Sequence, residues 1–393
     1  MLRKNRTTIC REGLYYLLIL SFIVGAAMLR EVNLLFILAG MMIGPLYFNW
    51  RFVTLSLRGM EVSRKLPQSV CASDLLVVDV EAANRRRRLG SWALVVEDHV
   101  QREGDPPAGG GTSVQVLVPY VAAGSKYETA YRGRLMQRGR YRFGPLRIST
   151  RFPLGLIRRT AVINHIDHLI VSPQLGRLSR QWSRLVRAQR MGGQGSQRRS
   201  GLVEADFHGL RDWRSGDSQR WIHWRTSARR QTLAVREFEQ RRNQDLALLL
   251  DLWLPEEPTW VDYGRVESAV SFAATVVADV CRHGSSRLLV AAAGQTILFQ
   301  HGDASLAYLQ EVIQHLAVIQ AGTQDRLPEL LSRTLEEISP GATTVLVSIR
   351  PCDLNDTDRF AHVWDDPRMR PVLRRLVMLQ AGSEEFSQYF QEE

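Results

Sequence analysis

The chain has 393 residues, which is enough for two or three domains of ordinary size. Apolar residues make up 45% and charged residues 23%, a balance that excludes a disordered or collagen-like chain. The net charge of +11 is uneven, because residues 177–242 carry +10 and residues 243–393 carry −11. A basic middle beside an acidic C-terminal third favours docking within the chain or with partners over a uniformly basic nucleic-acid coat. The four cysteines are far apart and form no CxxC pair, which argues against a disulfide framework or a thiolate metal centre: Cys10, Cys71, Cys281 and Cys352.

Two apolar segments near the N-terminus predict a membrane hairpin within residues 1–58. Residues 14–29 and 32–50 contain no charged side chain, and each is near the length that a spanning helix needs. A cleaved signal peptide fits poorly because the second segment follows at once, and a buried core hairpin is the alternative. The positive-inside rule then predicts an inner-membrane protein with both termini and the soluble domains in the cytoplasm. It rests on Arg3, Lys4, Arg6 and Arg11 before the hairpin, and on Arg51, Arg58, Arg64 and Lys65 after it.

Residues 59–175 predict a small β-sandwich, because short apolar runs rich in β-branched residues alternate with turn signals. Within this region, the four arginines at 85–88 are expected in a solvated turn, with lipid headgroups as an alternative ligand. His165, Asp167 and His168 are expected at a solvated strand edge rather than around a metal.

Residues 176–203 predict a basic helix followed by a glycine-rich linker. In a helix over residues 177–190, Leu178, Trp182 and Val186 share one face and arginines occupy another. Such a helix can lie on an anionic membrane or dock on the acidic C-terminal third, and the sequence leaves both possibilities open.

Residues 204–393 predict a doubly wound α/β domain that begins with an unusual motif. Apolar strands alternate with helical patterns, which is typical of a parallel sheet with crossover helices. The strands are expected at residues 246–252, 287–293, 295–300, 343–349 and 376–380, and the helices at 262–283, 303–320 and 326–338. The whole chain therefore combines membrane helices, an all-β domain and an α/β domain.

The motif at residues 204–242 is dense in arginine, tryptophan and acidic residues. Because charged residues are seldom buried unpaired, we expect a half-buried network in which tryptophans cover ion pairs. Asp217 is expected to cap a helix over residues 218–230. The network would pair Arg211, Arg214, Arg220 and Arg225 with Asp206, Asp212 and Asp217 beneath Trp213, Trp221 and Trp224.

This motif resembles the bacterial domain-of-unknown-function family fifty-eight. The chain departs from the family pattern in having Asp206 for Glu, Trp213 for Tyr and His223 for Asp. The resemblance implies a C-terminal domain similar to von Willebrand factor A (vWA) domains, partners among MoxR-type AAA+ ATPases and other vWA-domain proteins, and no established enzymatic activity. The residues expected to form a structural or interaction motif are Asp206, Phe207, Gly209, Leu210, Arg211, Trp213, Gly216, Asp217, Arg220, Trp224, Ser227, Arg229, Arg236 and Glu237.

The residues that could carry chemistry favour a scaffold. A metal-binding vWA domain needs Asp-x-Ser-x-Ser after its first strand; here Asp251 matches, but Trp253 and Pro255 replace the serines. Arg350 also follows a later strand where an acidic residue is expected, so we predict a degenerate site without metal or cofactor. Walker A, GxSxG and HExxH motifs are absent from the sequence.

Three hypotheses of function follow. The first is a non-catalytic, membrane-anchored adaptor that works with a MoxR-type ATPase in the assembly or maturation of client proteins. The second is binding of anionic lipid or nucleic acid through residues 177–242, although the anchor and the acidic C-terminal third argue against a dedicated nucleic-acid binder. The third is an enzyme built on Asp217 and His223, or on a carboxylate cluster of Asp206, Asp212 and Asp217, for which salt bridging is the preferred interpretation. The client and the oligomeric state cannot be read from the sequence.

Overall fold

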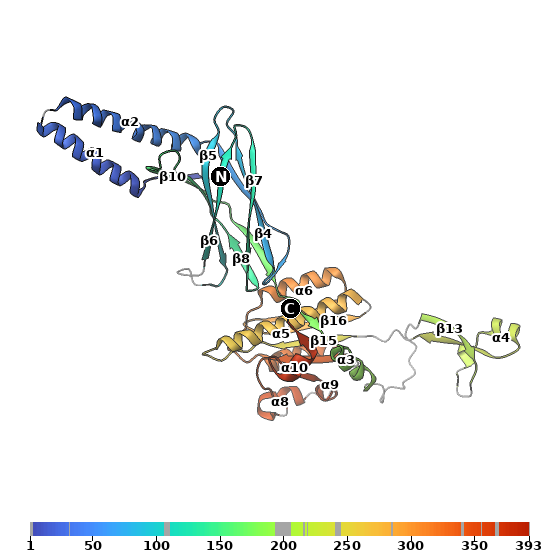
Figure 1. Ribbon diagram of the computed structural model, residues 1–393. Coiled ribbons are helices and arrows are strands. Elements are labelled where there is room, and N and C mark those ends of the chain that lie inside the picture. Colours follow the sequence, from blue (N-terminus) through green and yellow to red (C-terminus); the bar gives the residue numbers. More distant parts are fainter. Residues whose placement is uncertain are drawn as a thin grey trace. The chain divides into compact units, whose positions relative to one another are not determined.

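The protein is described from a computed structural model (Figure 1). The structure describes residues 3–30, 32–105, 111–192, 206–214, 217, 219–239, 245–283, 286–338, 342–354, 356–365 and 369–392. The chain divides into two compact units, Met1–Gln174 with Ile313–Val318, and Leu175–Val312 with Ile319–Glu393. The finer boundaries expected at residues 58, 175 and 203 remain predictions.

Two apolar helices form the N-terminal hairpin, α1 (Arg11–Arg30) and α2 (Asn33–Ser56). Both are long and apolar enough to cross a membrane, as the sequence predicted. Many of their apolar side chains face outward; Phe22 is 73% exposed and Leu34 is 72% exposed. The hydroxyl of Tyr16 donates a hydrogen bond to the carbonyl of Met42 at 2.8 Å and ties the two helices together. A strand that the sequence did not predict, β1 (Arg3–Ile9), precedes the hairpin.

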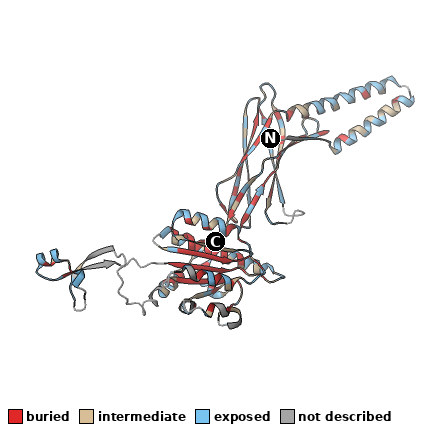
Figure 2. Cartoon of the chain, turned by 180° about the vertical axis from the view of Figure 1, so that it is seen from behind, coloured by how far each residue is buried: buried red, intermediate tan, exposed pale blue. Residues whose placement is uncertain are grey.

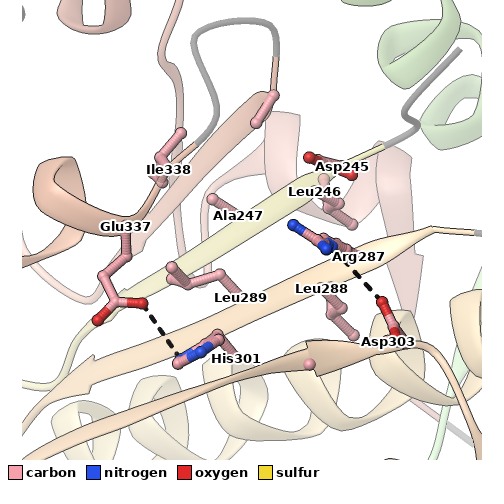
Figure 3. Close-up of a pocket in the computed structure, with 12 residues that line it drawn as sticks. Asp245, Leu246, Ala247, Arg287, Leu288, Leu289, His301, Asp303, Glu337 and Ile338 are labelled. Atoms are coloured by element: carbon pink, nitrogen blue, oxygen red, sulfur yellow. Dashed lines mark ion pairs between the residues drawn. The ribbon is translucent and has the colours of Figure 1, made fainter. Parts of the chain in front are cut away.

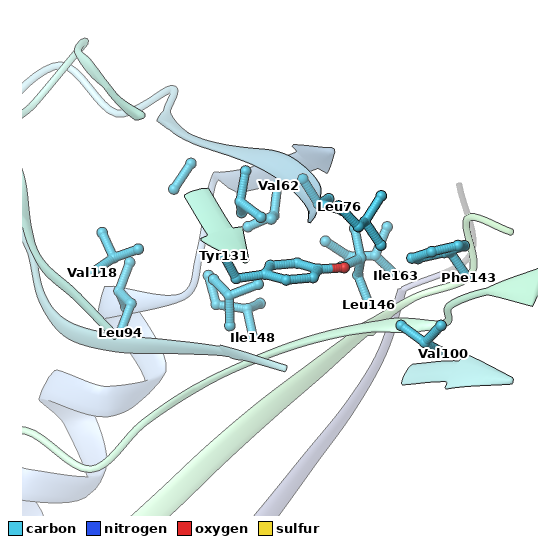
Figure 4. Close-up of a cluster of buried hydrophobic side chains, with 14 of the residues drawn as sticks. Val62, Leu76, Leu94, Val100, Val118, Tyr131, Phe143, Leu146, Ile148 and Ile163 are labelled. Carbon is cyan, nitrogen blue, oxygen red and sulfur yellow. The ribbon is translucent and has the colours of Figure 1, made fainter. Parts of the chain in front are cut away.

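Two sheets follow in a β-sandwich-like arrangement. One has the order β1-β10-β9-β5-β8-β11-β3 with β6 paired to β5, and the other has the order β2-β4-β7. Alternate residues of each strand point inward, and side chains such as Leu76, Leu94 and Ile148 form one buried cluster (Figure 4). The strands are β2 (Met60–Lys65), β3 (Val70–Cys71), β4 (Leu75–Asn84), β5 (Ser91–Arg102), β6 (Gly111–Val121), β7 (Lys126–Arg134), β8 (Gly139–Phe143), β9 (Leu146–Thr150), β10 (Ile157–Ile163) and β11 (Asp167–Ser172).

Arg64 lies inside this sandwich, which corrects its expected place in the basic flank of the membrane hairpin. Its side chain is 0% exposed and its guanidinium pairs with Asp98 at 2.5 Å and with Asp167 at 2.7 Å. The hydroxyl of Tyr131 donates to the second Asp98 oxygen at 2.8 Å. Alternation along β2 puts Arg64 on the inward side, where a charge needs such partners. Asp167 therefore serves a structural ion pair.

The second unit contains a mixed sheet of order β17-β16-β15-β18-β19. It is parallel except for β17, which runs antiparallel to β16 because a short turn joins them, too short for a crossover. Every residue of the central strand β15 is buried (Figure 2). The strands are β15 (Leu246–Asp251), β16 (Arg287–Ala293), β17 (Ile297–Asp303), β18 (Thr343–Ser348) and β19 (Val377–Gln380).

Helices alternate with these strands, and three of those near the C-terminus were not predicted. The expected ones are α5 (Trp260–His283), α6 (Leu306–Val318) and α7 (Leu327–Glu337). The additional ones are α8 (Thr357–Asp365), α9 (Met369–Leu373) and α10 (Glu384–Tyr389). They are short, and only five to nine residues give little helical periodicity to detect.

The basic helix α3 (Arg180–Gly192) docks on the second unit with its apolar face. Trp182 and Val186 are 4% and 9% exposed. The indole of Trp182 meets the ring of Phe272 edge-on, with 5.1 Å between ring centroids. Phe272 in turn contacts Phe386 and Phe390, so Trp182 joins a cluster of four aromatic rings. Just before the helix, β12 (Arg177–Leu178) pairs with β20 (Phe390–Gln391). These contacts favour docking on the acidic domain over insertion of this face into lipid.

We predict that Trp182→Ala lowers the free energy of unfolding of the second unit by about 3–5 kcal/mol, because it empties a filled aromatic site. The measurement is urea unfolding of the full-length chain. Arg184→Ala, on the exposed face of the same helix, is the matched control and should stay within about 0.5 kcal/mol. Unchanged stability in Trp182→Ala would contradict the docked position of α3.

Candidate functional site

The family-like motif folds as a small hairpin, which we call the signature hairpin (residues 206–239). Its strands β13 (Asp206–Asp212) and β14 (Ala234–Glu239) are antiparallel, with a bulge between Phe207 and Gly209. Between them lie a 3-10 turn η2 (Gln219–Trp221) and the helix α4 (Trp224–Arg230); Figure 1 labels β13 and α4. For Asp206, Phe207, Gly209, Arg211, Arg236 and Glu237 the structure describes the backbone positions alone, and Gly216 lies outside the described residues.

Asp217 closes a turn instead of capping the expected helix. Its Oδ2 accepts a hydrogen bond from the backbone N–H of Arg214 at 2.8 Å, and its own N–H donates to the Arg214 carbonyl at 3.0 Å. The helix begins seven residues later, at Trp224, where Nδ1 of His223 accepts from the N–H of Thr226 at 3.3 Å. His223 is thus the N-cap, which is the task that Asp performs well at such a position.

A serine and three small buried side chains hold the signature hairpin together. Ser227 Oγ accepts from the N–H of Ala234 at 2.9 Å and donates to the carbonyl of His223 at 3.1 Å. Ile222, Ala234 and Val235 are at most 7% exposed. Ser227 therefore fixes α4 to β14.

The tryptophans of the signature hairpin are exposed, contrary to their expected role as a cover over ion pairs, and the ion pairs themselves remain a prediction. Trp213, Trp221 and Trp224 are 38%, 45% and 66% exposed. Among the side chains of this segment that the structure describes, the buried ones are Ile222, Ser227, Ala234 and Val235, which do not cover three indoles. The exposed arginines around them are Arg214, Arg220, Arg225, Arg229 and Arg230. Tryptophan and arginine are the residues most enriched at the centres of protein interfaces.

The carboxyl edge of the central sheet holds a second polar site. Ligands of open α/β sheets bind outside the carboxyl ends of the strands, where the strand order reverses; here that point lies between β15 and β18. Asp251 ends β15 and is 1% exposed. Its Oδ2 accepts from Ser348 Oγ at 3.0 Å and from Arg350 Nε at 3.0 Å. Its Oδ1 is buried and has no hydrogen-bond partner.

Arg350 links Asp251 to a second carboxylate. Its Nη2 donates to Asp325 Oδ1 at 2.6 Å, and its guanidinium stacks 4.5 Å from the ring centroid of Trp253. Arg359 grips Asp325 with two hydrogen bonds, at 2.7 and 3.1 Å. Trp253 stands where a metal-binding vWA domain has a serine, and Arg350 stands where it has an acidic residue. The two replacements therefore contact each other. Asp325 and Arg359 were not anticipated, because they come from distant parts of the chain and carry no local motif.

The two carboxylates have opposite electrostatic environments. Burial raises the pKa of Asp251, although Arg350 and Ser348 oppose that shift. Partial burial also disfavours ionised Asp325, but the hydrogen bonds and charges of Arg359 and Arg350 outweigh it, so the pKa of Asp325 is lowered. Within the described part of the chain, no group of three His, Cys, Asp or Glu side chains is arranged to hold a metal. At Asp251 the positive charge comes from a guanidinium.

A cavity of about 420 Å³ lies at the opposite edge of the sheet, where β15 and β16 begin (Figure 3). Its walls carry two ion pairs, His301 with Glu337 at 3.3 Å and Arg287 with Asp303 at 3.6 Å. Open α/β sheets bind ligands at the carboxyl ends of their strands, whereas this cavity lies at the amino ends.

These features define a class of protein: a β-sandwich-like unit with two apolar N-terminal helices, and a mixed α/β unit that carries an exposed Arg/Trp hairpin. Residues 209–347 match the family described as "Protein of unknown function DUF58". The resemblance drawn from the motif is thereby confirmed for this range.

Among curated proteins, the chain is similar to "Uncharacterized protein YeaD" of Bacillus subtilis (strain 168), with 27% identity over 277 residues. The match covers 68% of this chain and 65% of that relative, so the chain spans just under two thirds of the relative's length. Among solved structures, the CARDB domain of PF1109 from Pyrococcus furiosus is 14% identical over 29% of this chain and 94% of that chain, with a TM-score of 0.20. Spo0M from Bacillus subtilis is 7% identical over 35% of this chain and 56% of that chain, with a TM-score of 0.19. Neither structure bears on function.

We predict that Arg350→Ala lowers the free energy of unfolding by about 3–5 kcal/mol, because it leaves the Asp251 carboxylate buried without its cation. The measurements are urea unfolding of the wild type and the variants, and thermal unfolding of the wild type with and without Mg²⁺. Added Mg²⁺ should leave the melting temperature of the wild type unchanged. Arg282→Ala, at an exposed position of α5, is the control. A rise of several degrees in the wild type would contradict the assignment of Arg350 as the resident cation.

We predict a pH signature for Asp325→Asn. Since the pKa of Asp325 is lowered in the folded state, its ionised form stabilises the fold. The stability lost on substitution is full above the unfolded-state pKa of about 3.9 and disappears as the pH falls through the folded-state value. Thermal unfolding of both proteins between about pH 7 and pH 3 measures this. Asp303→Asn, whose side chain is 87% exposed, should show little difference at any pH.

Proposed function

We propose that the chain is a membrane-anchored adaptor, without catalytic activity of its own, that binds a partner protein through the signature hairpin. The observation that carries this proposal is the exposed set of Trp213, Trp221 and Trp224 among arginines. Large apolar side chains that a fold leaves exposed together mark an interaction site. Buried at an interface, tryptophan and arginine contribute more binding energy than other residues.

The basic surroundings of these tryptophans favour an acidic partner surface. The family resemblance suggests a MoxR-type AAA+ ATPase as that partner, with other vWA-domain proteins in the same assembly. The task would be the assembly or maturation of client proteins. We also propose that the second unit is a vWA-like domain. Its central β15 ending in Asp251 and its antiparallel edge strand β17 support this.

The absence of catalysis is part of the proposal, and two arrangements support it. Arg350 neutralises Asp251 at the edge of the sheet where chemistry would be expected. In the signature hairpin, Asp217 and His223 both serve local structure, one in a turn and the other as a helix cap. Their side chains are therefore engaged in folding contacts rather than converging on a shared cleft.

Membrane anchoring is supported by α1 and α2, whose length and composition suit a bilayer. Arg6 and Arg11 precede the hairpin, and Arg51 and Arg58 stand at its other end, all exposed. With Arg64 removed from this flank, the remaining charges still favour a cytoplasmic position for both ends and for the soluble units.

The alternative function is binding of anionic lipid or nucleic acid through the Arg/Trp-rich stretch 177–242. The exposed arginines of α3 and of the signature hairpin support it, whereas the buried Trp182 removes the apolar face of α3 from contention. Phosphate binding weakens steeply with salt, because counterions are released on binding. Salt dependence therefore separates the two functions.

The test is affinity capture with the full-length chain and the MoxR-type ATPase. We predict that the double variant Trp221→Ala/Trp224→Ala loses at least about 2 kcal/mol of binding, or roughly 30-fold in affinity, because hot-spot indoles are removed. Trp260→Ala, which removes an indole that is 85% exposed on α5, is the matched control and should bind normally. Melting temperatures of all proteins check that folding is intact.

Equal capture of the ATPase by the double variant would contradict the proposed site. Recovery of nucleic acid or lipid instead, lost steeply as salt rises, would favour the alternative function.

A further inference from the structure

A chain of aromatic rings crosses from helix α2 to the adjoining end of the β-sandwich. Phe48 and Phe52 lie 5.9 Å apart between ring centroids, and Phe52 lies 5.6 Å from Phe152. Phe152 stacks at 6.0 Å on Trp92, which lies 4.1 Å from Tyr120. Trp92 and Tyr120 are cross-strand partners at the ends of β5 and β6. The row of rings therefore begins on the apolar helix and continues on the sheet.

Much of this aromatic surface faces outward. Trp92 is 44% exposed, Tyr120 is 40% exposed and Phe48 is 55% exposed. Leu154, in the loop between β9 and β10, adds a side chain that is 47% exposed. A continuous apolar surface of this kind indicates a contact with something other than water. Because it adjoins the candidate membrane span, the surface of the bilayer is the natural occupant.

The loop at residues 151–156 is held at the level of the last two turns of α2. The carbonyl of Leu156 accepts from the N–H of Cys10 at 2.9 Å, and the fully buried Asn49 accepts from the N–H of Ile157 at 3.0 Å. Ser91 Oγ donates to the carbonyl of Ser56 at 2.8 Å. The sandwich is therefore fixed close to the point where α2 would leave the membrane.

Arg86 adds a further constraint and departs from the solvated turn expected at 85–88, where Arg85 is exposed as predicted. Its Nη1 donates to the carbonyl of Leu55 at 2.5 Å, in the last turn of α2, and its Nη2 donates to the carbonyl of Gly90 at 3.0 Å. The guanidinium thus caps the helix C-terminus and joins it to the start of β5. Arg87 and Arg88, its neighbours, are exposed.

Exposed arginines surround the aromatic row. Arg151 and Arg158 flank the loop in the sequence, Arg51 lies on α2, and Arg11 follows the hydrogen-bonded Cys10. Glu12 is the acidic neighbour at the start of α1. Arginine and tryptophan beside a membrane span are the side chains that settle at a headgroup layer, the ring at the acyl boundary and the guanidinium on phosphate.

We propose that this end of the sandwich rests on the cytoplasmic leaflet, with Trp92, Tyr120, Phe152 and Leu154 at the headgroup–acyl boundary and the arginines on anionic lipid headgroups. The inference rests on the membrane anchoring in the proposed function. It adds that the sandwich is a membrane-seated domain, held at a fixed height, rather than one tethered to a free anchor.

The test uses the full-length chain in nanodiscs of phosphatidylcholine and phosphatidylglycerol. Single cysteines carry spin labels after replacement of Cys10, Cys71, Cys281 and Cys352. Label positions are Leu154→Cys in the contact face, Ile37→Cys in α2, and Met136→Cys as the matched control. Met136 is 70% exposed and lies beyond the end of the β4–β7 ladder that is farther from α2. Collision with oxygen, which dissolves in lipid, is compared with collision with an aqueous nickel chelate.

We expect the label at 37 to be deep in lipid, the label at 154 to lie at the interface, and the label at 136 to be aqueous. In the Arg151→Glu/Arg158→Glu background, the label at 154 should gain nickel access. A label at 154 as aqueous as that at 136, while 37 remains deep, would overturn this inference and leave the anchor intact. An aqueous label at 37 would instead overturn the anchoring itself. Equal loss of both reagents at 154 would mean that protein covers it, which also overturns the inference.

Discussion

The ion pair between Asp251 and Arg350 occupies the carboxyl edge of the central sheet in the α/β unit. The carboxyl edge of a parallel sheet is where such folds bind ligands and place reactive groups. Here the central carboxylate at that edge is 1% exposed and already paired with a guanidinium. Asp325 and Trp253 contact the same arginine, and Arg359 holds Asp325. The two carboxylates and two guanidiniums at this edge therefore pair with one another.

In the proposed function the signature hairpin provides the binding surface. Among the side chains that the structure describes in it, few are buried, and Ser227 and His223 fix its helix with hydrogen bonds. Three indoles are exposed to water, and burying them against a partner would be favourable. The membrane-proximal aromatic row has the same origin, since the sandwich core is complete without Trp92 and Tyr120. Each unit thus has large apolar side chains that its own core does not cover.

Much of the fold follows from patterns that the sequence displays. The two apolar spans, the strand alternation of the sandwich and the buried run of β15 depend on local periodicity, which a single sequence reveals. The replacement of a serine and an acidic residue by Trp253 and Arg350 was also visible. What the sequence did not show is that these two replacements contact each other.

The errors share a physical cause, which is that burial depends on partners distant in the chain. Arg64 looked like a membrane flank, yet Asp98 and Asp167 draw it into the core. The tryptophans of the signature hairpin were expected to be partly buried over ion pairs, yet they are 38% to 66% exposed. The sequence left open whether the apolar face of α3 contacts lipid or protein. In the structure Trp182 on this face packs against Phe272. Asp325 and Arg359 belong to the site through tertiary contact alone.

The central claim is that the signature hairpin binds a partner protein. The most direct measurement is site-specific photocrosslinking in living cells, with benzoylphenylalanine in place of Trp224 and, as the control, in place of Trp260. The account predicts a MoxR-type ATPase adduct from position 224 that is absent from position 260. Adducts to nucleic acid or lipid alone at position 224, or equal ATPase adducts from both positions, would contradict it.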